Sequence, residues 1–412
     1  MSTLHSAPGG ASTRSDGVPQ GSLVFERVTL TVGAVAHGGH CVARIGDPPG
    51  RVVFVRHALP GERVIAEITE EHPGYLRADA IEVLEPSPER VPAPCPYARP
   101  DACGGCDLQH VAPPAQLEWK AAVVREQLAR LAGLPDFPVR VEPLPGGPLG
   151  WRTRVRYTVD AAGRPGLLKH RSHEVVPIDR CRIAHAAIQE LPVTATAWPS
   201  ASTVDTVAPA VGPALVGPDG IFDSTVVERA AGREWTLPAG AFWQVHPDAA
   251  DTLAGAVLDL LEPRPGESAW DLYGGAGLFA AALATKLGPD APITLVESAP
   301  AAVAAARSNL TDLAGLRVVS ARVEAALAGR LRGPVDLVVL DPPRTGAGAA
   351  VTRAVMAAGP RAVAYVACDP AAFARDVRTF RDGGWRLAAL RAYDLFPMTH
   401  HVECVGLLVQ EG

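Results

Sequence analysis

The sequence predicts a multidomain α/β protein with a small N-terminal β-barrel, a central α+β domain and a C-terminal Rossmann-like domain. Three observations predict this organisation. The 412 residues exceed what one ordinary hydrophobic core accommodates. Short alternating runs separated by glycine and proline turns fill the first part of the chain. Beyond about residue 237, apolar strand patterns alternate with helical patterns, which is typical of an open parallel sheet.

Composition indicates a packed globular protein, because 48% of the residues are hydrophobic. No apolar run is long enough to span a bilayer, and the N-terminus lacks the regions of a signal peptide. We therefore expect a cytoplasmic protein without a membrane partner. We also expect a monomer. The net charge of −6 neither indicates nor excludes a nucleic-acid partner, since binding depends on where the basic groups lie.

The barrel is predicted between residues 21 and 86, after a glycine-rich tail, residues 1–20, that we expect to be disordered. Its strands include the runs from Arg51 to Arg56 and from Tyr75 to Leu84, with turn signals between them. Small barrels of this kind often bind oligonucleotides. The alternative is a barrel without a ligand.

The central domain is predicted over residues 87–236, and its clearest signal is a group of cysteines. Cys103 and Cys106 flank two glycines, so both thiols can reach one metal. Cys95 is a candidate third ligand and Cys181 a candidate fourth. Four thiolates suit an iron–sulfur cluster or zinc, and the thiolates alone do not separate the two. Unliganded cysteines are the remaining alternative.

The same domain carries basic residues at alternate positions. A helical pattern from Gln116 to Leu131 precedes a strand pattern in which Arg152, Arg154 and Arg156 share one face. Guanidinium groups on one face suit phosphates. An ordinary solvated face is the alternative, and both interpretations stay open.

The C-terminal part, residues 237–412, contains a strand, the glycine turn Gly274–Gly277 and a helix that begins at Leu278. Glycines let a backbone loop approach a ligand closely. Glu297 ends the next predicted strand, where an acid can bind ribose hydroxyls. This pattern alone would equally allow a nicotinamide dinucleotide. A further buried strand ends in Asp341, followed by two prolines and Arg344.

A cysteine ends another buried strand. The apolar run from Arg361 to Ala367 is followed by Cys368, and Pro370 ends the pattern because proline has no N–H to donate. Ligands of open α/β sheets bind at the carboxyl ends of strands, where this thiol would lie. A buried structural thiol is the alternative.

These motifs together resemble the RNA uracil-C5 methyltransferases, and they occur in that family's order. The matching elements are Asp271–Gly277, Glu297, Asp341–Arg344, Cys368–Pro370 and Phe396–Glu403. The N-terminal barrel resembles a TRAM domain, an RNA-binding barrel. The resemblance implies a class I methyltransferase domain at the C-terminus, S-adenosylmethionine as cofactor, and a [4Fe–4S] cluster on the four cysteines, with zinc as the alternative.

The resemblance also implies roles for individual residues. Cys368 would add to C6 of the uracil and Glu403 would remove the C5 proton. Arg344 would stabilise charge on a uracil oxygen, and Asp376 matches an acid that follows the catalytic cysteine. The cofactor-binding residues would be Gln244, Tyr273, Glu297 and Asp341.

The implied substrate is a uridine in structured RNA, with 23S ribosomal RNA favoured and the T-loop of transfer RNA possible. An RNA-binding protein with an inert methyltransferase domain is the main alternative function. A radical S-adenosylmethionine enzyme would need its cysteines beside the cofactor, whereas these cysteines precede the glycine turn in another domain. An amino-methylating enzyme would carry an aromatic residue where Arg344 stands.

Overall fold

The structure is a computed structural model that describes residues 22–47, 50–331 and 333–411. The tail predicted to be disordered, residues 1–20, lies outside the described residues. The chain forms two compact units: the first ends at Ser87, and the second runs from Pro88 and also includes the segment Val35–Gly39. In the part of the chain described here, no helix combines the length and apolarity needed to cross a bilayer.

The first unit is a small β-barrel, as the sequence predicts. Its strands follow the order β1-β5-β6-β4-β3. Backbone hydrogen bonds between Gly33 and Val42 (2.7 Å) and between Val42 and Ala34 (2.8 Å) join the chain after β1 to β3 and close the sheet. The strands are β1 (Arg27–Thr31), β3 (His40–Ile45), β4 (Arg51–Arg56), β5 (Arg63–Glu71) and β6 (Tyr75–Glu85). The short strand β2 (Val35–Ala36) lies in the segment that belongs to the second unit.

In the second unit, the chain from Arg154 to Pro218 forms a five-stranded sheet of order β10-β9-β8-β11-β12. Its strands are β8 (Arg154–Val159), β9 (Pro165–Leu168), β10 (Val175–Pro177), β11 (Thr203–Val207) and β12 (Leu215–Pro218). The short helices α2 (Ala186–Gln189) and η2 (Pro192–Ala195) precede β11. A separate hairpin, β13 (Thr225–Ala230) and β14 (Arg233–Pro238), leads to the C-terminal sheet.

The C-terminal sheet has eight strands in the order β17-β16-β15-β18-β19-β21-β20-β7. Strands β15 to β19 run parallel to one another, and β21 is antiparallel to both β19 and β20. The strands are β15 (Ala269–Leu272), β16 (Ile293–Glu297), β17 (Leu316–Ser320), β18 (Leu337–Leu340), β19 (Ala362–Ala367), β20 (Trp385–Asp394) and β21 (Glu403–Gln410).

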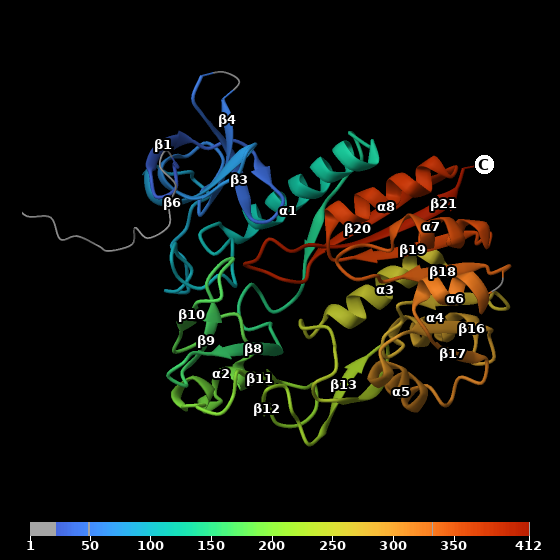
Figure 1. Cartoon of the computed structure of the whole chain (residues 1–412). Helices are drawn as coiled ribbons and strands as arrows, with labels where there is room; N and C mark the ends of the chain where they lie inside the picture. The colour runs from blue at the N-terminus through green and yellow to red at the C-terminus, as the bar shows by residue number, and fades with distance from the viewer. Residues whose placement is uncertain (1–21, 48–49, 332, 412) are drawn as a thin grey trace, which may run out of the picture. The chain divides into compact units, whose positions relative to one another are not determined.

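Helices cover both faces of this sheet (Figure 1). One core layer contains side chains of α3 (Ala249–Leu261), α4 (Leu278–Leu287) and α5 (Pro300–Asn309). The other contains side chains of α6 (Val323–Gly329), α7 (Gly348–Ala357) and α8 (Pro370–Asp382). Strands β18 and β19 are buried along their whole length, which explains why they read as unbroken apolar runs.

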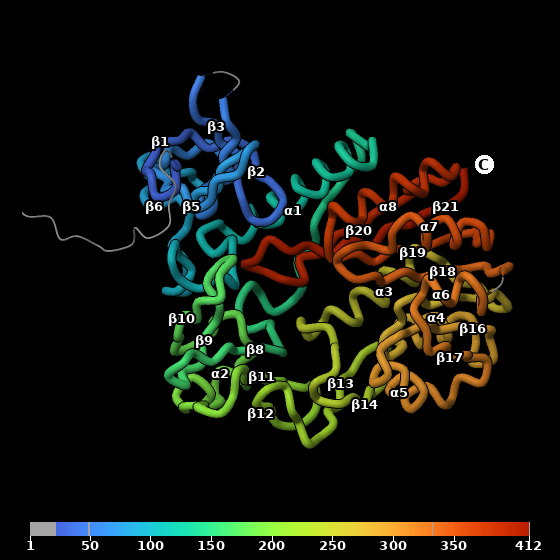
Figure 2. The backbone as a smooth tube through the Cα atoms, viewed as in Figure 1, coloured from blue at the N-terminus to red at the C-terminus, as the bar shows by residue number. Residues whose placement is uncertain are grey.

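Part of the segment that the sequence assigns to the central domain packs on the C-terminal sheet. Helix α1 (Pro113–Gln127) and the π-helical turn η1 (Leu128–Ala132) share the core layer of α8. The chain then forms β7 (Val141–Pro143), which pairs in parallel with β20 and supplies the last strand of the sheet (Figure 2). The local pattern predicts the helix α1. It gives no sign that β7 pairs with β20, because periodicity does not encode the pairing of distant strands.

A buried ion pair fixes α1 to the end of β20. Lys120 Nζ lies 2.5 Å from Asp394 Oδ1 and 3.1 Å from the carbonyl oxygen of Phe396, and the Lys120 side chain is fully buried. Burial lowers the pKa of Lys120, and the nearby Asp394 carboxylate opposes that shift. Removing either partner would leave an uncompensated buried charge, which is costly.

We predict that Lys120→Ala lowers the free energy of unfolding by about 3–5 kcal/mol, the usual cost of breaking a buried ion pair. Arg130→Ala is the control, because Arg130 forms an exposed ion pair with Glu126 one turn away. Urea denaturation of both variants measures the difference. Equal stability of the two variants would show that the buried pair does not hold α1.

Candidate active site

The side chains expected to carry out chemistry meet at the carboxyl edge of the C-terminal sheet. Strands β19 and β21 are antiparallel, with Ala367 opposite Cys404. Extending this register by one residue places Cys368 beside Glu403. Asp341 follows β18, the neighbour of β19 on its other side. The structure therefore brings together a half-buried thiol, a buried carboxyl group and a second acid, although they lie far apart in the sequence.

Burial and mutual repulsion shift the pKa values of these groups upward. Burial, and next the neighbouring Glu403, raise the pKa of the Cys368 thiol to about 11, while Arg344 opposes the shift. Burial and the charge of Asp341 raise the pKa of Glu403 well above its ordinary value. Burial also raises the pKa of Asp341 to about 7. A nearby positive charge would favour the ionised forms of these groups.

The glycine turn predicted at Gly274–Gly277 lies between β15 and α4. Gly277 has φ 98°, and a Cβ atom there would lie 2.5 Å from Leu310, so only glycine fits. Tyr273, just before the turn, has φ 65°, which is unusual for a residue with a side chain. Strained backbone of this kind is frequent where a loop clamps a ligand.

Two acids hold the glycine turn and the helix that follows it. Glu297 Oε2 accepts a hydrogen bond from Gly275 N (3.1 Å), and its other oxygen accepts bonds from the backbone at the start of α5. Asp271 is buried, and its Oδ2 accepts from Ala280 N (2.9 Å). Among the described residues, no donor reaches Asp271 Oδ1. This unpartnered buried oxygen fits a ligand that brings a donor or a positive charge.

Arg154 turns out to be structural. Its guanidinium donates to the carbonyl oxygens of Ala239 (2.8 Å) and Ala241 (2.7 Å) and pairs with Glu228 (3.0 Å). These bonds fix the segment just before Gln244, which is half-buried. Arginine contacts therefore position the predicted cofactor-binding loop.

The other two arginines of that predicted basic face also have partners. Arg156 is largely exposed but bound to Asp205 at 2.8 Å. Arg152 donates to the carbonyl oxygen of Arg154 (3.1 Å). Two of the three arginines, Arg154 and Arg156, are therefore paired with acids, whereas the contact of Arg152 is to a backbone carbonyl oxygen.

The four cysteines of the predicted metal site influence one another. Burial raises the pKa of Cys103 to about 11, and the charges of Cys181 and Cys95 add to the shift. Burial also raises the pKa of Cys106, and the charges of Cys181 and Cys103 add to that shift. In the part of the chain that the structure describes, however, no three cysteine, histidine or acidic side chains form a group ready to hold a metal ion. The donor chemistry fits a thiolate-bound metal, but the geometry alone does not define one.

The cysteine loop is hydrogen-bonded to the loop that leads to Glu403. The backbone N–H groups of Asp107 and Leu108 donate to the carbonyl oxygen of Met398 at 3.1 and 3.0 Å. Asp107 Oδ2 lies 2.6 Å from His400 Nδ1 and accepts from His400 N at 3.2 Å. Gln116 of α1 accepts from Met398 N at 3.0 Å. We call this set of contacts the Asp107 junction.

Asp376 supports the other side of the site. Its Oδ2 accepts hydrogen bonds from the Tyr365 hydroxyl (2.5 Å) and from the N–H groups of Ala347 (2.8 Å) and Gly348 (3.2 Å). These bonds hold the segment that follows Arg344. Asp376 therefore acts on the site through the backbone.

Sequence reasoning did not assign roles to Asp107, Asp271 or His37. Asp107 directly follows Cys106, and Asp271 precedes the glycine turn, so position offered a signal for both. His37 Nε2 lies 3.3 Å from Asp369 Oδ2, next to Cys368 in the chain. No local pattern could have indicated that contact, because more than three hundred residues separate the pair.

Two family profiles match the chain. A TRAM domain profile covers residues 21–81, and a profile described as tRNA (Uracil-5-)-methyltransferase covers residues 229–411. The second match includes the glycine turn, Cys368 and Glu403.

Individual proteins are similar over nearly the whole chain. A protein from Streptomyces avermitilis described as an uncharacterized RNA methyltransferase is 48% identical, across 93% of this chain and 98% of that protein. The 23S rRNA (uracil(1939)-C(5))-methyltransferase RlmD of Chromohalobacter salexigens is 33% identical, across 98% of this chain and 92% of that protein. The solved structure of the Pyrococcus abyssi tRNA (uracil-54, C5)-methyltransferase in complex with S-adenosyl-L-homocysteine shares the fold. Its TM-score is 0.67 at 22% identity, and the match covers 92% of this chain and 100% of that one.

We predict that alkylation of Cys368 by iodoacetamide accelerates with pH up to about pH 11, because the thiolate is the reactive form. At pH 9, Arg344→Ala should slow the reaction, since it removes the charge that lowers the pKa of this thiol. Glu403→Gln should accelerate it, since it removes the repelling charge. Mass spectrometry of the peptide that contains Cys368 measures the rates.

Arg353→Ala is the control for this experiment, because Arg353 is exposed on α7 and does not affect the pKa of the Cys368 thiol. Shifts of the same sign in the Arg344 and Glu403 variants would contradict the arrangement of charges described here.

Proposed function

This chain belongs to the tRNA (uracil-5-)-methyltransferase family of RNA-modifying enzymes, and we propose that it methylates C5 of a uridine in 23S ribosomal RNA through a covalent adduct on Cys368. The observation that carries the proposal is the Cys368 thiol beside the Glu403 carboxyl group at the carboxyl edge of the sheet. The ribosomal substrate is supported by the relative from Chromohalobacter, and a transfer RNA is the alternative.

The chain's own residues supply a nucleophile and a base. The Cys368 thiolate adds to C6 of uracil, and the electron pair of the C5–C6 bond moves toward C5 and the C4 carbonyl. Arg344 lowers the pKa of the Cys368 thiol and can stabilise the negative charge that develops on the uracil. After C5 has gained a methyl group, Glu403 accepts the C5 proton, and elimination of the Cys368 thiolate restores the double bond.

S-adenosylmethionine supplies the electrophilic methyl group and a positive charge. The residues that would hold it are Tyr273 and the glycine turn, Glu297, Asp341 and Gln244, with Asp271 beneath the turn. Asp271 Oδ1 has no donor among the described residues, and burial raises the pKa of this carboxyl group to about 7, so a cationic ligand suits it.

Cys95, Cys103, Cys106 and Cys181 would hold a [4Fe–4S] cluster, with zinc as the alternative. The support is the electrostatic coupling among the four thiols and the all-thiolate donor set. Binding would require the thiols to lose protons that burial now retains. The role of the site is structural, since the neighbouring Asp107 fixes the loop that leads to Glu403.

We predict that Cys368→Ala abolishes formation of 5-methyluridine, because the proposed mechanism activates C5 by addition of this thiol to C6. Cys404→Ala is the matched control, since Cys404 is fully buried on β21 and should retain most of the activity. Nucleoside mass spectrometry on 23S ribosomal and transfer RNA transcripts measures the product and identifies the preferred RNA. Full activity of the Cys368 variant would refute the covalent mechanism. The alternative function, an RNA-binding protein with an inert methyltransferase domain, requires that the wild-type protein make no product.

Glu403→Gln should allow methyl transfer but block removal of the C5 proton. With RNA that carries tritium at C5 of uridine, we expect the release of tritium to water to fall at least ~100-fold, because general bases contribute roughly 10²–10⁴-fold. A methylated RNA–protein adduct should accumulate and survive denaturing electrophoresis. Tritium release at the wild-type rate would assign the base to another residue.

Asp107→Asn should reduce kcat for methylation by roughly 10–100-fold with little change in KM for RNA, because it weakens the support of the loop before Glu403. Asp101→Asn is the control, since Asp101 lies in the same cysteine loop but binds the Lys169 side chain at the surface. Steady-state kinetics of both variants test the role of the Asp107 junction. An equal loss in both would indicate general damage to the loop.

A further inference from the structure

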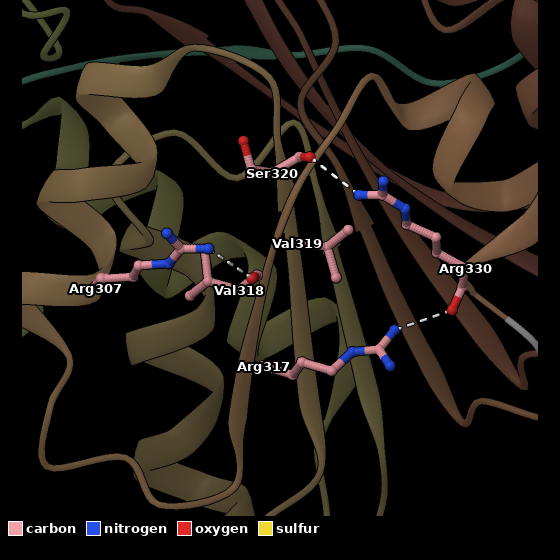
Figure 3. A pocket seen from close by; sticks show the side chains of 6 residues that line it. All are labelled: Arg307, Arg317, Val318, Val319, Ser320 and Arg330. Carbon is pink, nitrogen blue, oxygen red and sulfur yellow. Dashed lines mark hydrogen bonds between the residues drawn. The ribbon is translucent and has the colours of Figure 1, made fainter.

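A cavity of about 440 Å³ lies at the outer edge of the C-terminal sheet, against strand β17. Three arginines from three different elements line it, and Figure 3 shows their side chains around the strand. Arg307 belongs to the last turn of α5, Arg317 to β17, and Arg330 to the C-terminal end of α6. The remaining lining residues are Val318, Val319 and Ser320.

Backbone carbonyl groups use only a small part of the hydrogen-bonding capacity of these arginines. Arg307 Nη2 donates to the oxygen of Val318 (3.4 Å), and Arg330 Nη1 donates to that of Ser320 (3.2 Å). Arg317 Nη2 donates to the oxygen of Arg330 (3.0 Å). A guanidinium carries five N–H donors, so most donors of each group stay available.

The positive charge of the cavity is not neutralised by an ion pair among the described residues. Within the described ranges, no ion pair involves any of these three arginines, whereas other arginines of the same sheet are paired: Arg361 with Glu267 at 2.6 Å, for example. The whole chain has a net charge of −6, so the concentration of positive charge here does not follow from general basicity.

Protection of an edge strand explains only part of this arrangement. Charged side chains on a sheet edge prevent pairing with other chains, and the three carbonyl contacts fit that role. Protection does not require three like charges around one cavity, because like charges repel one another. An anion between the guanidinium groups would replace this repulsion with attraction, and the planar guanidinium suits the oxygens of a phosphate.

The cavity runs along β17 from Arg317 to Ser320, the residue at the carboxyl end of the strand. Ser320 ends β17 and pairs with Glu297 at the end of β16. Four strand spacings of ~4.8 Å separate β17 from β19, which precedes Cys368, so the cavity is on the order of 20 Å from the thiol. A bound phosphate there would belong to a part of the RNA away from the reacting uridine.

We propose that the cavity formed by Arg307, Arg317 and Arg330 binds a phosphodiester group of the substrate RNA, outside the nucleotide that is methylated. This inference rests on the proposed function, which makes RNA the substrate. The site contributes to affinity for the RNA backbone and takes no part in the methyl transfer.

The test compares a variant with Arg307→Gln, Arg317→Gln and Arg330→Gln with a control that carries Arg264→Gln, Arg353→Gln and Arg386→Gln. Both lose three positive charges, and the control arginines are exposed elsewhere in the second unit. RNA affinity is measured by fluorescence anisotropy across a salt series. We expect the slope of log K against log salt to become less steep by ~0.7 for one lost phosphate contact in the cavity variant only.

Kinetics separate this inference from the proposed function. The cavity variant should show KM for RNA raised roughly 10-fold with kcat unchanged at saturating RNA. This result is expected when the lost contact stabilises the bound substrate and the transition state equally. Equal salt slopes in the cavity variant and the control would overturn the inference, even if the wild-type protein methylates RNA. Conversely, an altered slope supports the phosphate site even if the wild-type protein makes no 5-methyluridine.

Inorganic phosphate distinguishes an RNA site from a site for free phosphate. If phosphate raises the melting temperature of the wild-type protein but not that of the cavity variant, while RNA binding matches the control, the cavity binds free phosphate and the assignment to RNA is wrong. The melting temperatures without ligand confirm that all variants are folded.

Discussion

The arrangement of the site depends on the hydrogen bonds of the Asp107 junction. The chain between β20 and β21 must bring Glu403 beside Cys368, yet it contains no helix or strand to fix it. Met398, at its centre, has φ 68°, a conformation that a residue with a side chain adopts only when its surroundings enforce it. The backbone of the cysteine loop and Gln116 of α1 supply that enforcement. In the proposed mechanism, the central segment therefore positions Glu403 without contributing a reacting group.

Charge provides the second constraint. In addition to burial, Glu297 raises the pKa of Asp271, Asp271 raises that of Asp341, and Asp341 raises that of Glu403. Such a cluster is unfavourable when every member is ionised, and a cationic ligand relieves the repulsion. Cofactor binding and activation of the base are therefore coupled in this account, because the positive charge that delivers the methyl group also favours the ionised form of the base.

The local elements were predictable, while several long-range contacts were not. Alternation and turn residues predicted the barrel, and the buried run before Cys368 predicted β19, because local periodicity reports burial directly. Periodicity carries no information on partners, so neither the pairing of β7 with β20 nor the contact of His37 with Asp369 could be foreseen. The arginines of β8 show the same limit at a single residue. The alternating pattern correctly predicted that Arg154 lies on a strand, but it could not predict the ion pair with Glu228 of β13.

Mass spectrometry of the complex formed with 5-fluorouridine RNA and S-adenosylmethionine tests the central claim most directly. Fluorine at C5 cannot be removed as a proton, so Glu403 cannot complete the reaction after the thiol has added and the methyl group has been transferred. The account predicts a covalent complex with the RNA attached to Cys368, in which the base retains both fluorine and the new methyl group. Attachment to any other residue, or the absence of a covalent complex from an enzyme that methylates ordinary RNA, would contradict it.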